Sequence, residues 1–251
     1  MKLQVFLATL VAAFLTSSLG SVALGTTIIS DDFESYADTT AMQAVWGAAG
    51  VGTLDTAFGN PGQSYRNNGG VQNQQTIAGL VPTAANPVVY TVDIYDDGTS
   101  ANKRMTAGLR SSAVANLFEM GMYNSPNHYA VRAVLPGPSW VAFSNMVDDS
   151  NQPIQNAPVA GWHTYKMVLD GASATFTIDL NGDGNINGTE VLAAAFIGAS
   201  PIDTVRLGVG LSSAGGGANF DNVNLSVVPE PASMLLMGLA CVGLGFARIR
   251  S

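Results

Sequence analysis

Short runs of alternating apolar and polar residues, separated by clusters of Gly, Asn, Asp and Pro, recur through the middle of this chain. The run Trp162–Leu169 is a clear case, because every second residue would share one side of a strand: His163, Tyr165, Met167 and Leu169. Alternation with a period of two is typical of strands that are buried on one face. No amphipathic helix longer than about ten residues is evident, and Ala41–Ala49 is the single candidate for a short one. The pattern predicts an all-β sandwich of two antiparallel sheets.

The strands expected from this pattern begin near residue 88 and continue to residue 227. Turn-forming residues separate them, as in Asp96-Asp97-Gly98 and Asn124–Asn127. The expected strands are Val88–Tyr95, Arg104–Ser111, Leu117–Tyr123, His128–Val134, Trp140–Phe143, Trp162–Leu169, Ser173–Ile178, Thr204–Gly210 and Ala218–Val227.

The first 25 residues have the three parts of a secretory signal. Lys2 supplies the positive charge, Val5–Leu15 the apolar stretch, and Ala23-Leu24-Gly25 the small residues before a cleavage site. The alternative is an uncleaved membrane anchor. The apolar stretch has 11 residues, whereas a membrane-spanning helix needs about 20. We therefore expect a signal helix that is removed before Thr26.

The last 24 residues, 228–251, also have three parts. Pro229, Glu230 and Pro231 come first, an apolar segment Ala232–Ala247 follows, and Arg248 and Arg250 close the chain. We expect the apolar segment to form a short transmembrane helix whose arginines stay in the cytoplasm. The alternative is a buried helix of the globular domain, which a segment apolar on every face fits poorly.

This tail resembles the PEP-CTERM sorting signal of Gram-negative bacteria. The resemblance implies that an exosortase-type membrane protease cuts near Pro229–Pro231. The chain would pass through an inner-membrane intermediate and then reach the cell surface or the extracellular matrix.

The region Thr26–Val227, which remains after both ends are set aside, is strongly acidic. It keeps 17 of the 18 acidic residues of the chain and 7 of its 10 basic residues, a net charge of −10. Such a charge repels phosphate backbones, so we expect no binding of nucleic acid. The one cysteine, Cys241, lies in the C-terminal apolar segment, so the core has no disulfide. Its two histidines, His128 and His163, are too few for a three-histidine zinc site.

Three short stretches resemble the laminin-G-like, or concanavalin A-like, jelly-roll family. They are Asp31–Glu34, Gly161–Tyr165 and Phe220–Val223. The resemblance covers about 200 residues, 26–227. It implies a jelly roll in which the first and last strands lie together. It also implies glycan binding, on the concave face or at a calcium-bearing rim.

One segment matches the twelve-residue calcium loop of EF-hands at every critical position. The segment is Asp179–Glu190, and it also resembles the loop of dockerin modules, although a dockerin carries two such loops. The predicted calcium ligands are Asp179, Asn181, Asp183, Asn185 through its backbone carbonyl, Asn187 and Glu190. Gly184 permits the sharp turn at position 6. The alternative is a hairpin turn that uses Asp, Asn and Gly for their backbone tolerance alone.

Several aromatic residues are candidates for stacking against sugar rings, with Trp140, Tyr123 and Tyr129 preferred over Trp46 and Trp162. The alternative is that these rings belong to the hydrophobic core. His163 fits a strand residue better than a catalytic base. Each aspartate pair, Asp96-Asp97 and Asp148-Asp149, fits a solvated loop end, with a second calcium site as the alternative.

Three functions remain open: glycan binding, a purely structural role in the surface matrix, and glycan degradation. Glycoside hydrolysis usually needs two carboxylates about 5 to 9 Å apart. Jelly-roll glucanases carry them as Glu-x-Asp-x-x-Glu on one strand, and this pattern is absent from the sequence. Neither a nucleophile elbow nor a phosphate loop occurs. We therefore expect a binding protein for glycan or exopolysaccharide and no enzyme.

Overall fold

The structure is a computed structural model, and it describes residues 25–48, 50–99, 103–113, 117–123, 127–133, 140–193, 201–208 and 217–229. Of the predicted signal segment only Gly25 is among these residues, and the predicted transmembrane segment lies outside them. Within the described residues, no helix is long and apolar enough to span a bilayer.

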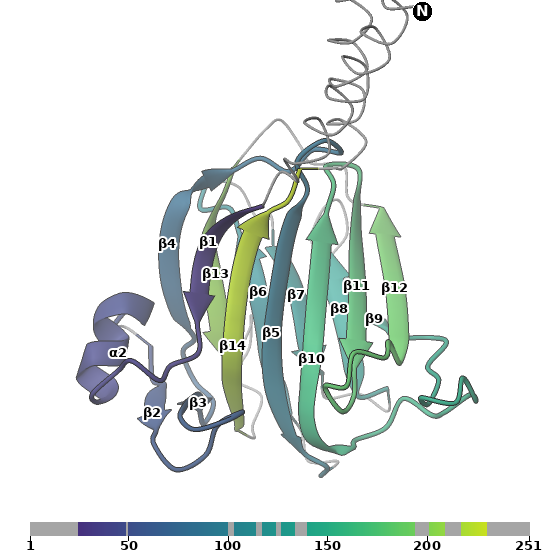
Figure 1. Ribbon diagram of the computed structural model, residues 1–251, viewed down its shortest axis with the longest axis horizontal. Coiled ribbons are helices and arrows are strands. Elements are labelled where there is room, and N and C mark those ends of the chain that lie inside the picture. The colour runs from purple at the N-terminus through teal and green to yellow at the C-terminus, as the bar shows by residue number, and fades with distance from the viewer. Residues whose placement is uncertain are drawn as a thin grey trace, which may run out of the picture.

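Two antiparallel sheets stack face to face, and Figure 1 shows the larger sheet in front of the smaller one. The larger sheet has eight strands in the order β12-β11-β10-β5-β14-β3-β2, with β1 also paired to β14. Their bounds are β1 Thr26–Asp31, β2 Thr53–Asp55, β3 Ser64–Asn67, β5 Val88–Asp97, β10 Ala160–Leu169, β11 Ser173–Asp179, β12 Gly188–Ala193 and β14 Ala218–Val227.

The smaller sheet has six strands in the order β4-β13-β6-β7-β8-β9. Their bounds are β4 Asn73–Leu80, β6 Thr106–Arg110, β7 Leu117–Met122, β8 Tyr129–Ala133, β9 Val141–Ala142 and β13 Ile202–Gly208. Strands distant in sequence are neighbours in both sheets, which is the topology of a jelly-roll-like sandwich. The prediction of an all-β, antiparallel two-sheet jelly roll is confirmed.

The first and last strands pair, as the jelly-roll resemblance implied. Strand β1 runs antiparallel to β14, with Asp31 opposite Val223 and Thr26 opposite Val227. The pairing places Thr26 and Val227, the two ends of the core domain, at the same end of the sandwich.

The hydrophobic core lies between the two sheets and follows from the period-two alternation. In β10 the side chains of His163, Tyr165, Met167 and Leu169 are buried, as the sequence predicted. The facing sheet contributes Phe118, Met120 and Met122 from β7, which are all 0% exposed. The alternate residues of each strand therefore point to the outer faces of the sandwich.

The single helix of the described residues is α2, Thr39–Trp46. Asp38 caps its N-terminus by accepting a 2.8 Å hydrogen bond from the Ala41 backbone N–H. Gly47, with φ of 81°, ends the helix in a conformation that favours glycine. Met42 and Trp46 are buried beneath the helix, so Trp46 is a core residue.

The sequence did not predict five strands, β1 to β4 and β12. The four N-terminal strands contain many polar residues, and β2 has only three residues, so alternation is weak there. Strand β12 follows the Asp/Asn-rich turn, where the sequence alone does not distinguish a strand from a short helix. Pairing with β11, from Ser173 opposite Ala193 to Ile178 opposite Gly188, settles it as a strand.

Candidate ligand-binding face

The outer face of the six-stranded sheet carries a row of charged residues, one from each of several neighbouring strands. Arg206 of β13 lies opposite Gly108 of β6, Gly108 lies opposite Glu119 of β7, and Glu119 lies opposite Arg132 of β8. Paired residues share a face of the sheet. Because Leu109, Phe118, Val131 and Val205 point into the core, this row points outward.

An ion pair forms the centre of the row. Arg132 donates to the Glu119 Oε2 atom through Nε at 2.5 Å and also contacts it through Nη2. Thr106 donates a weaker 3.4 Å hydrogen bond to Oε1. Glu119 is 2% exposed and Arg132 is 3% exposed. Burial raises the pKa of Glu119, and the Arg132 charge opposes this effect.

Gly108 lies beside this ion pair and has no side chain to separate it from the next strand. A Cβ atom at Gly108 would lie 2.6 Å from the Phe118 carbonyl oxygen and 3.0 Å from Glu119 Cγ, so no larger residue fits. With no side chain at this position, Arg206 is next to Glu119 across β6. Arg206 is 9% exposed, and its Nε has no hydrogen-bond partner among the described residues.

Two half-buried aromatic rings border the row. The rings of Tyr123 and Trp140 stack at 4.8 Å with an angle of 17° between their planes. The Arg104 guanidinium lies 5.2 Å from the Tyr123 ring centre and 5.5 Å from that of Trp140, and Arg132 lies 4.8 Å from Trp140. These distances are in the range of cation–π contacts. The buried Trp140 Nε1 has no hydrogen-bond partner among the described residues.

We call this set the arginine face. It comprises Arg104, Arg110, Glu119, Tyr123, Arg132, Trp140 and Arg206, of which Arg104, Arg110, Tyr123 and Trp140 are half-buried and the others are buried. Trp140 and Tyr123, two of the three preferred aromatic candidates, are thus neighbours. The arginines were not predicted from the sequence, although Arg110 of β6 and Arg104, two residues before this strand, have the same outward parity.

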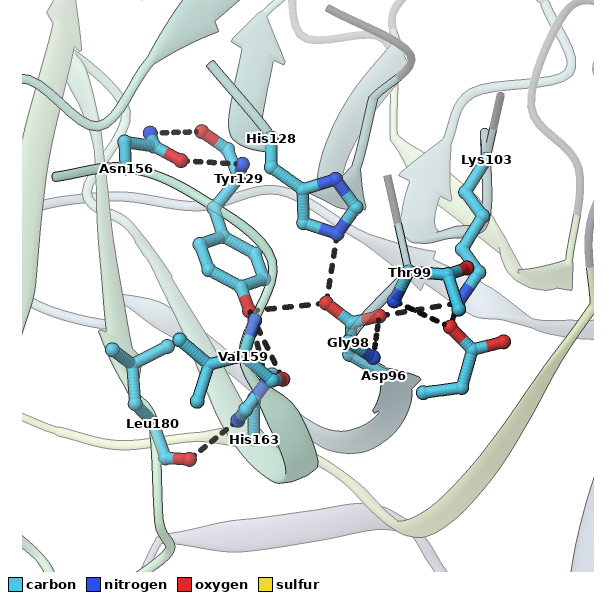
Figure 2. A network of polar contacts seen from close by, with 11 residues as sticks. Asp96, Gly98, Thr99, Lys103, His128, Tyr129, Asn156, Val159, His163 and Leu180 are labelled. Atoms are coloured by element: carbon cyan, nitrogen blue, oxygen red, sulfur yellow. Dashed lines mark hydrogen bonds and ion pairs between the residues drawn. The ribbon is translucent and has the colours of Figure 1, made fainter. Parts of the chain in front are cut away.

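The structure corrects the prediction for Tyr129, because this residue is 0% exposed between the sheets and cannot reach a ligand there. Its hydroxyl group donates to Asp96 Oδ2 at 3.0 Å and lies 3.0 Å from His163 Nε2 (Figure 2). Asn156 holds the Tyr129 backbone through hydrogen bonds of 2.7 and 2.8 Å. Tyr129 therefore has a structural role.

Asp96 is the centre of this buried network, which sequence reasoning missed because it placed Asp96 in a solvated turn. Its carboxylate receives hydrogen bonds from His128 Nε2 at 2.8 Å and Lys103 Nζ at 3.1 Å (Figure 2). The Tyr129 hydroxyl and the Gly98 backbone N–H complete the set. Asp96 is 0% exposed. Burial acts to raise its pKa, but His128, Gly98 and Lys103 outweigh burial and lower the pKa to about 2.

The predicted calcium residues lie in the hairpin between β11 and β12. Asp179 is buried, and its carboxylate accepts backbone N–H groups of Asn181 at 3.1 Å, Gly182 at 2.8 Å and Gly184 at 2.7 Å. Asn181 and Asn187 both donate to the Asp149 carboxylate, at 2.9 and 3.0 Å. The structure thus brings Asp179, Asn181 and Asn187 together and adds Asp149.

Three of the predicted calcium residues are not part of that group. Asp183 accepts both the backbone N–H and the side-chain amide of Asn185. Glu190 lies opposite Phe176, whose side chain is in the core, so Glu190 and Asp179 occupy opposite faces of the sheet. The Glu190 carboxylate accepts from Ser144 at 3.1 and 3.3 Å.

As they lie, the six predicted ligands do not form one coordination sphere. The described residues contain no group of three or more His, Cys, Asp or Glu side chains placed to hold a metal ion.

A second aromatic cluster lies on the outer face of the eight-stranded sheet. Trp162 lies opposite Tyr95, with ring centres 5.5 Å apart, and Phe58 stacks on Trp162 at 5.6 Å. Phe58 is 38% exposed. No cation–π contact is recorded for these rings among the described residues.

Comparison with known sequences identifies the C-terminal tail. The signature of the PEP-CTERM protein-sorting motif matches residues 227–251. The chain carries a PEP-CTERM sorting motif. This motif implies an exported protein that is anchored in the membrane before processing. No curated protein matches the sequence.

Comparison with solved structures finds other sandwich proteins at low sequence identity. The chain is similar to the cellulose-induced protein Cip1, with 13% identity, a TM-score of 0.49, and coverage of 78% of this chain and 96% of that one. It is also similar to the catalytic domain of a glycoside hydrolase family 131 protein from Coprinopsis cinerea, with 12% identity, a TM-score of 0.48, and coverage of 82% and 96%. A Bauhinia forficata lectin in complex with GalNAc matches with 7% identity, a TM-score of 0.46, and coverage of 82% and 99%. At these identities the likeness concerns the fold.

Proposed function

We propose that this exported PEP-CTERM chain binds glycan outside the cell through the arginine face of its sandwich. The observation that carries the proposal is the stack of Tyr123 and Trp140 with Arg104 and Arg132 against it. Ligand sites combine aromatic surface with a few polar groups that fix orientation. A sugar ring has apolar C–H faces that pack on an aromatic ring and hydroxyl groups that bond to charged side chains.

The position of these rings supports binding rather than a core role. Both rings project from the outer face of the six-stranded sheet, where they cannot contribute to packing between the sheets. Both residues are half-buried, so neither is wholly enclosed by the protein. The jelly-roll resemblance also implies glycan binding.

A glycosidase function has less support. Glu119 is the single acidic residue in the charged row, and Arg132 holds its carboxylate. Hydrolysis of a glycosidic bond usually needs a second carboxylate at about 5 to 9 Å, and the row offers none among its paired positions.

A glycan array probed with the full chain in a mild detergent tests the proposal, with and without calcium. We expect binding to at least one glycan class. We expect Trp140→Ala to weaken this binding about tenfold, because loss of a stacked ring costs about 1.4 kcal/mol. Trp162→Ala is the matched control, since it removes the same side chain from the opposite outer face, and we expect at most a twofold effect.

Three results would contradict this proposal in different ways. No binding to any glycan of a broad array would favour a purely structural role in the surface matrix. Release of reducing ends from a polysaccharide would favour an enzyme. Loss of binding in Trp162→Ala with full binding in Trp140→Ala would move the site to the other sheet. The melting temperature of each variant shows whether it is folded.

The sorting motif completes the proposal with a processing partner. An exosortase-type protease would cut near Pro229–Pro231, while the apolar segment Ala232–Ala247 holds the chain in the inner membrane. Arg248 and Arg250 would keep the tail on the cytoplasmic side. The β domain would then reach the surface or matrix of a Gram-negative bacterium. Mass spectrometry of the exported protein would find a C-terminus near residue 229, and an intact Ser251 would contradict this route.

Calcium remains part of the proposal as a structural ion of the β11–β12 hairpin. Its support is the sequence match of Asp179–Glu190 and the proximity of Asp179, Asn181, Asn187 and Asp149. Glu190 would have to leave Ser144 to join them.

A further inference from the structure

The two sheets of the sandwich carry opposite charge. The strands of the eight-stranded sheet contain eight acidic and two basic residues, whereas those of the six-stranded sheet contain two acidic residues and three arginines. The three arginines are Arg110, Arg132 and Arg206, and Arg104 lies just before β6. Four of the seven basic residues of the core domain therefore belong to one face.

The two acidic residues of the six-stranded sheet do not balance these arginines. Glu119 is paired with Arg132. Asp203 lies near the start of β13, where its carboxylate accepts the Ser112 backbone N–H at 2.9 Å and also contacts the Ser112 hydroxyl. With Glu119 ionised, the arginine face keeps an excess of about three positive charges on a chain whose core is strongly acidic.

Arg206 shows that this arrangement is unfavourable without a ligand. Burial lowers the pKa of Arg206, the nearby Arg110 charge lowers it further, and Glu119 only partly opposes them. The Nε of Arg206 has no hydrogen-bond partner among the described residues. A buried guanidinium with an unused donor and a like charge beside it costs free energy that folding alone does not require.

We propose that the arginine face binds an acidic polysaccharide whose carboxylates pair with the arginines, an inference that rests on the proposed glycan-binding function. Guanidinium groups bind carboxylates through two parallel hydrogen bonds. Trp140 and Tyr123 supply the surface for a sugar ring, and Arg104, Arg110 and Arg206 supply charge for uronate groups along the chain. The pairing of Glu119 with Arg132 shows that a carboxylate fits this environment.

A polysaccharide fits this face better than a nucleic acid does. The strands of the other sheet carry eight acidic residues, so a nucleic acid long enough to extend beyond the arginine face would be repelled. A polyuronate has one charge per sugar and apolar ring faces between the charges, which suits a face that combines arginines with aromatic rings.

The test compares two forms of one polymer, polygalacturonate and its fully methyl-esterified form, which share a backbone and differ in charge. Binding of the full chain in mild detergent is measured by isothermal titration at 50 and 500 mM NaCl. We expect the charged polymer to bind and the esterified polymer to bind at least tenfold more weakly. Salt should weaken binding of the charged polymer, because it screens the polymer's carboxylates and the half-buried Arg104 and Arg110.

The variants Arg206→Gln and Arg110→Gln test the face itself. Each removes one charge without breaking the Glu119–Arg132 pair, and each should weaken polygalacturonate binding about tenfold. Lys166→Gln is the matched control, because it removes one positive charge from the exposed outer face of the eight-stranded sheet. We expect this control to change binding less than twofold.

The possible failures are distinguishable. Equal binding of both polymers, still lost in Trp140→Ala, would overturn the acidic ligand and keep the glycan-binding function. Binding of neither polymer, together with no binding on the glycan array, would overturn both the acidic ligand and the glycan-binding function. Tighter binding of single-stranded DNA than of polygalacturonate, or an equal loss in Lys166→Gln, would overturn the assignment of a polysaccharide to the arginine face.

Discussion

Replacement of Asp96 by Asn should destabilise the sandwich at neutral pH and remove part of its acid sensitivity. The Asp96 carboxylate joins the two sheets, since β5 carries it while the donors His128 and Tyr129 come from the start of β8 and Lys103 precedes β6. An Asn side chain has one acceptor oxygen for these three donors and the Gly98 backbone N–H, and it places an NH₂ group among them. It also removes the buried partner of Lys103, and breaking a buried ion pair costs about 3 to 5 kcal/mol.

The acid sensitivity follows from the lowered pKa. The pKa of Asp96 falls from 3.8 to about 2 in the folded protein, which corresponds to about 2.4 kcal/mol of stability. Because the folded pKa is the lower one, this contribution is complete above about pH 5 and is lost as the pH falls toward 2. By pH 3 about 1 kcal/mol of it is gone. In Asp96→Asn this part of the pH dependence should be absent.

Urea unfolding followed by tryptophan fluorescence measures both effects, since all three tryptophans lie in the β domain. The free energy of unfolding is compared at pH 7, 5, 4 and 3. Asp97→Asn is the control, because Asp97 also contacts Lys103 but its side chain is 49% exposed. Exposed pairs contribute about 0 to 1 kcal/mol. An equal loss of stability in both variants, or parallel pH curves for wild type and Asp96→Asn, would refute this account.

Two further predictions concern the eight-stranded sheet. Burial raises the pKa of Asp221 to about 6, so the free energy of unfolding should fall as pH rises from about 4 to 6. In Asp221→Asn the melting temperature should vary less with pH across this range, and the same pH dependence in the variant and the wild type would contradict the raised pKa. Calcium added to the chelator-treated chain should raise its melting temperature, and Asp179→Asn should remove the rise; a constant melting temperature up to millimolar calcium would remove calcium from the proposal.

The fold was largely readable from the sequence because alternation and turn residues depend on local chemistry. Strands such as β5 and β10 have an apolar residue at nearly every second position, and the structure confirms them. Polar strands are different. β4, for example, has the sequence Asn73–Leu80 with two glutamines at its start, and its place is fixed by pairing with β13, which no local pattern shows.

The charged site illustrates the same limit. Alternation alone gives Arg110 of β6 and Arg104, just before β6, the same outward direction, and it gives Arg132 and Arg206 outward directions on their own strands. What the sequence does not show is that β13, β6, β7 and β8 are neighbours in that order. Strand order turns four separate arginines into one face, and it depends on long-range pairing.

The calcium loop shows another limit, because a strong local sequence match meets a strand register that local reasoning cannot see. Twelve residues fit the ligand pattern in sequence. The pairing of Glu190 with Phe176 then places the last ligand on the inner side of the sheet, whereas Asp179 lies on the outer side. In an EF-hand the residues after the loop begin a helix, which can turn position 12 back toward the ion. Here a strand begins at Gly188 and keeps Glu190 away.

Charges inside and outside the sandwich are balanced differently, and this difference supports the arginine face as the binding site that we propose. Between the sheets, Asp96 is matched by donors from several segments, as burial of a charge requires. On the outer face, Arg206 keeps an unused donor beside the like charge of Arg110. A buried charge whose hydrogen bonds are all formed within the chain is accounted for by the stability of the fold. An outward excess of like charge needs a partner from outside the chain. The arginine face, and not the buried histidine and aspartate network, is therefore where a ligand of this exported protein should bind.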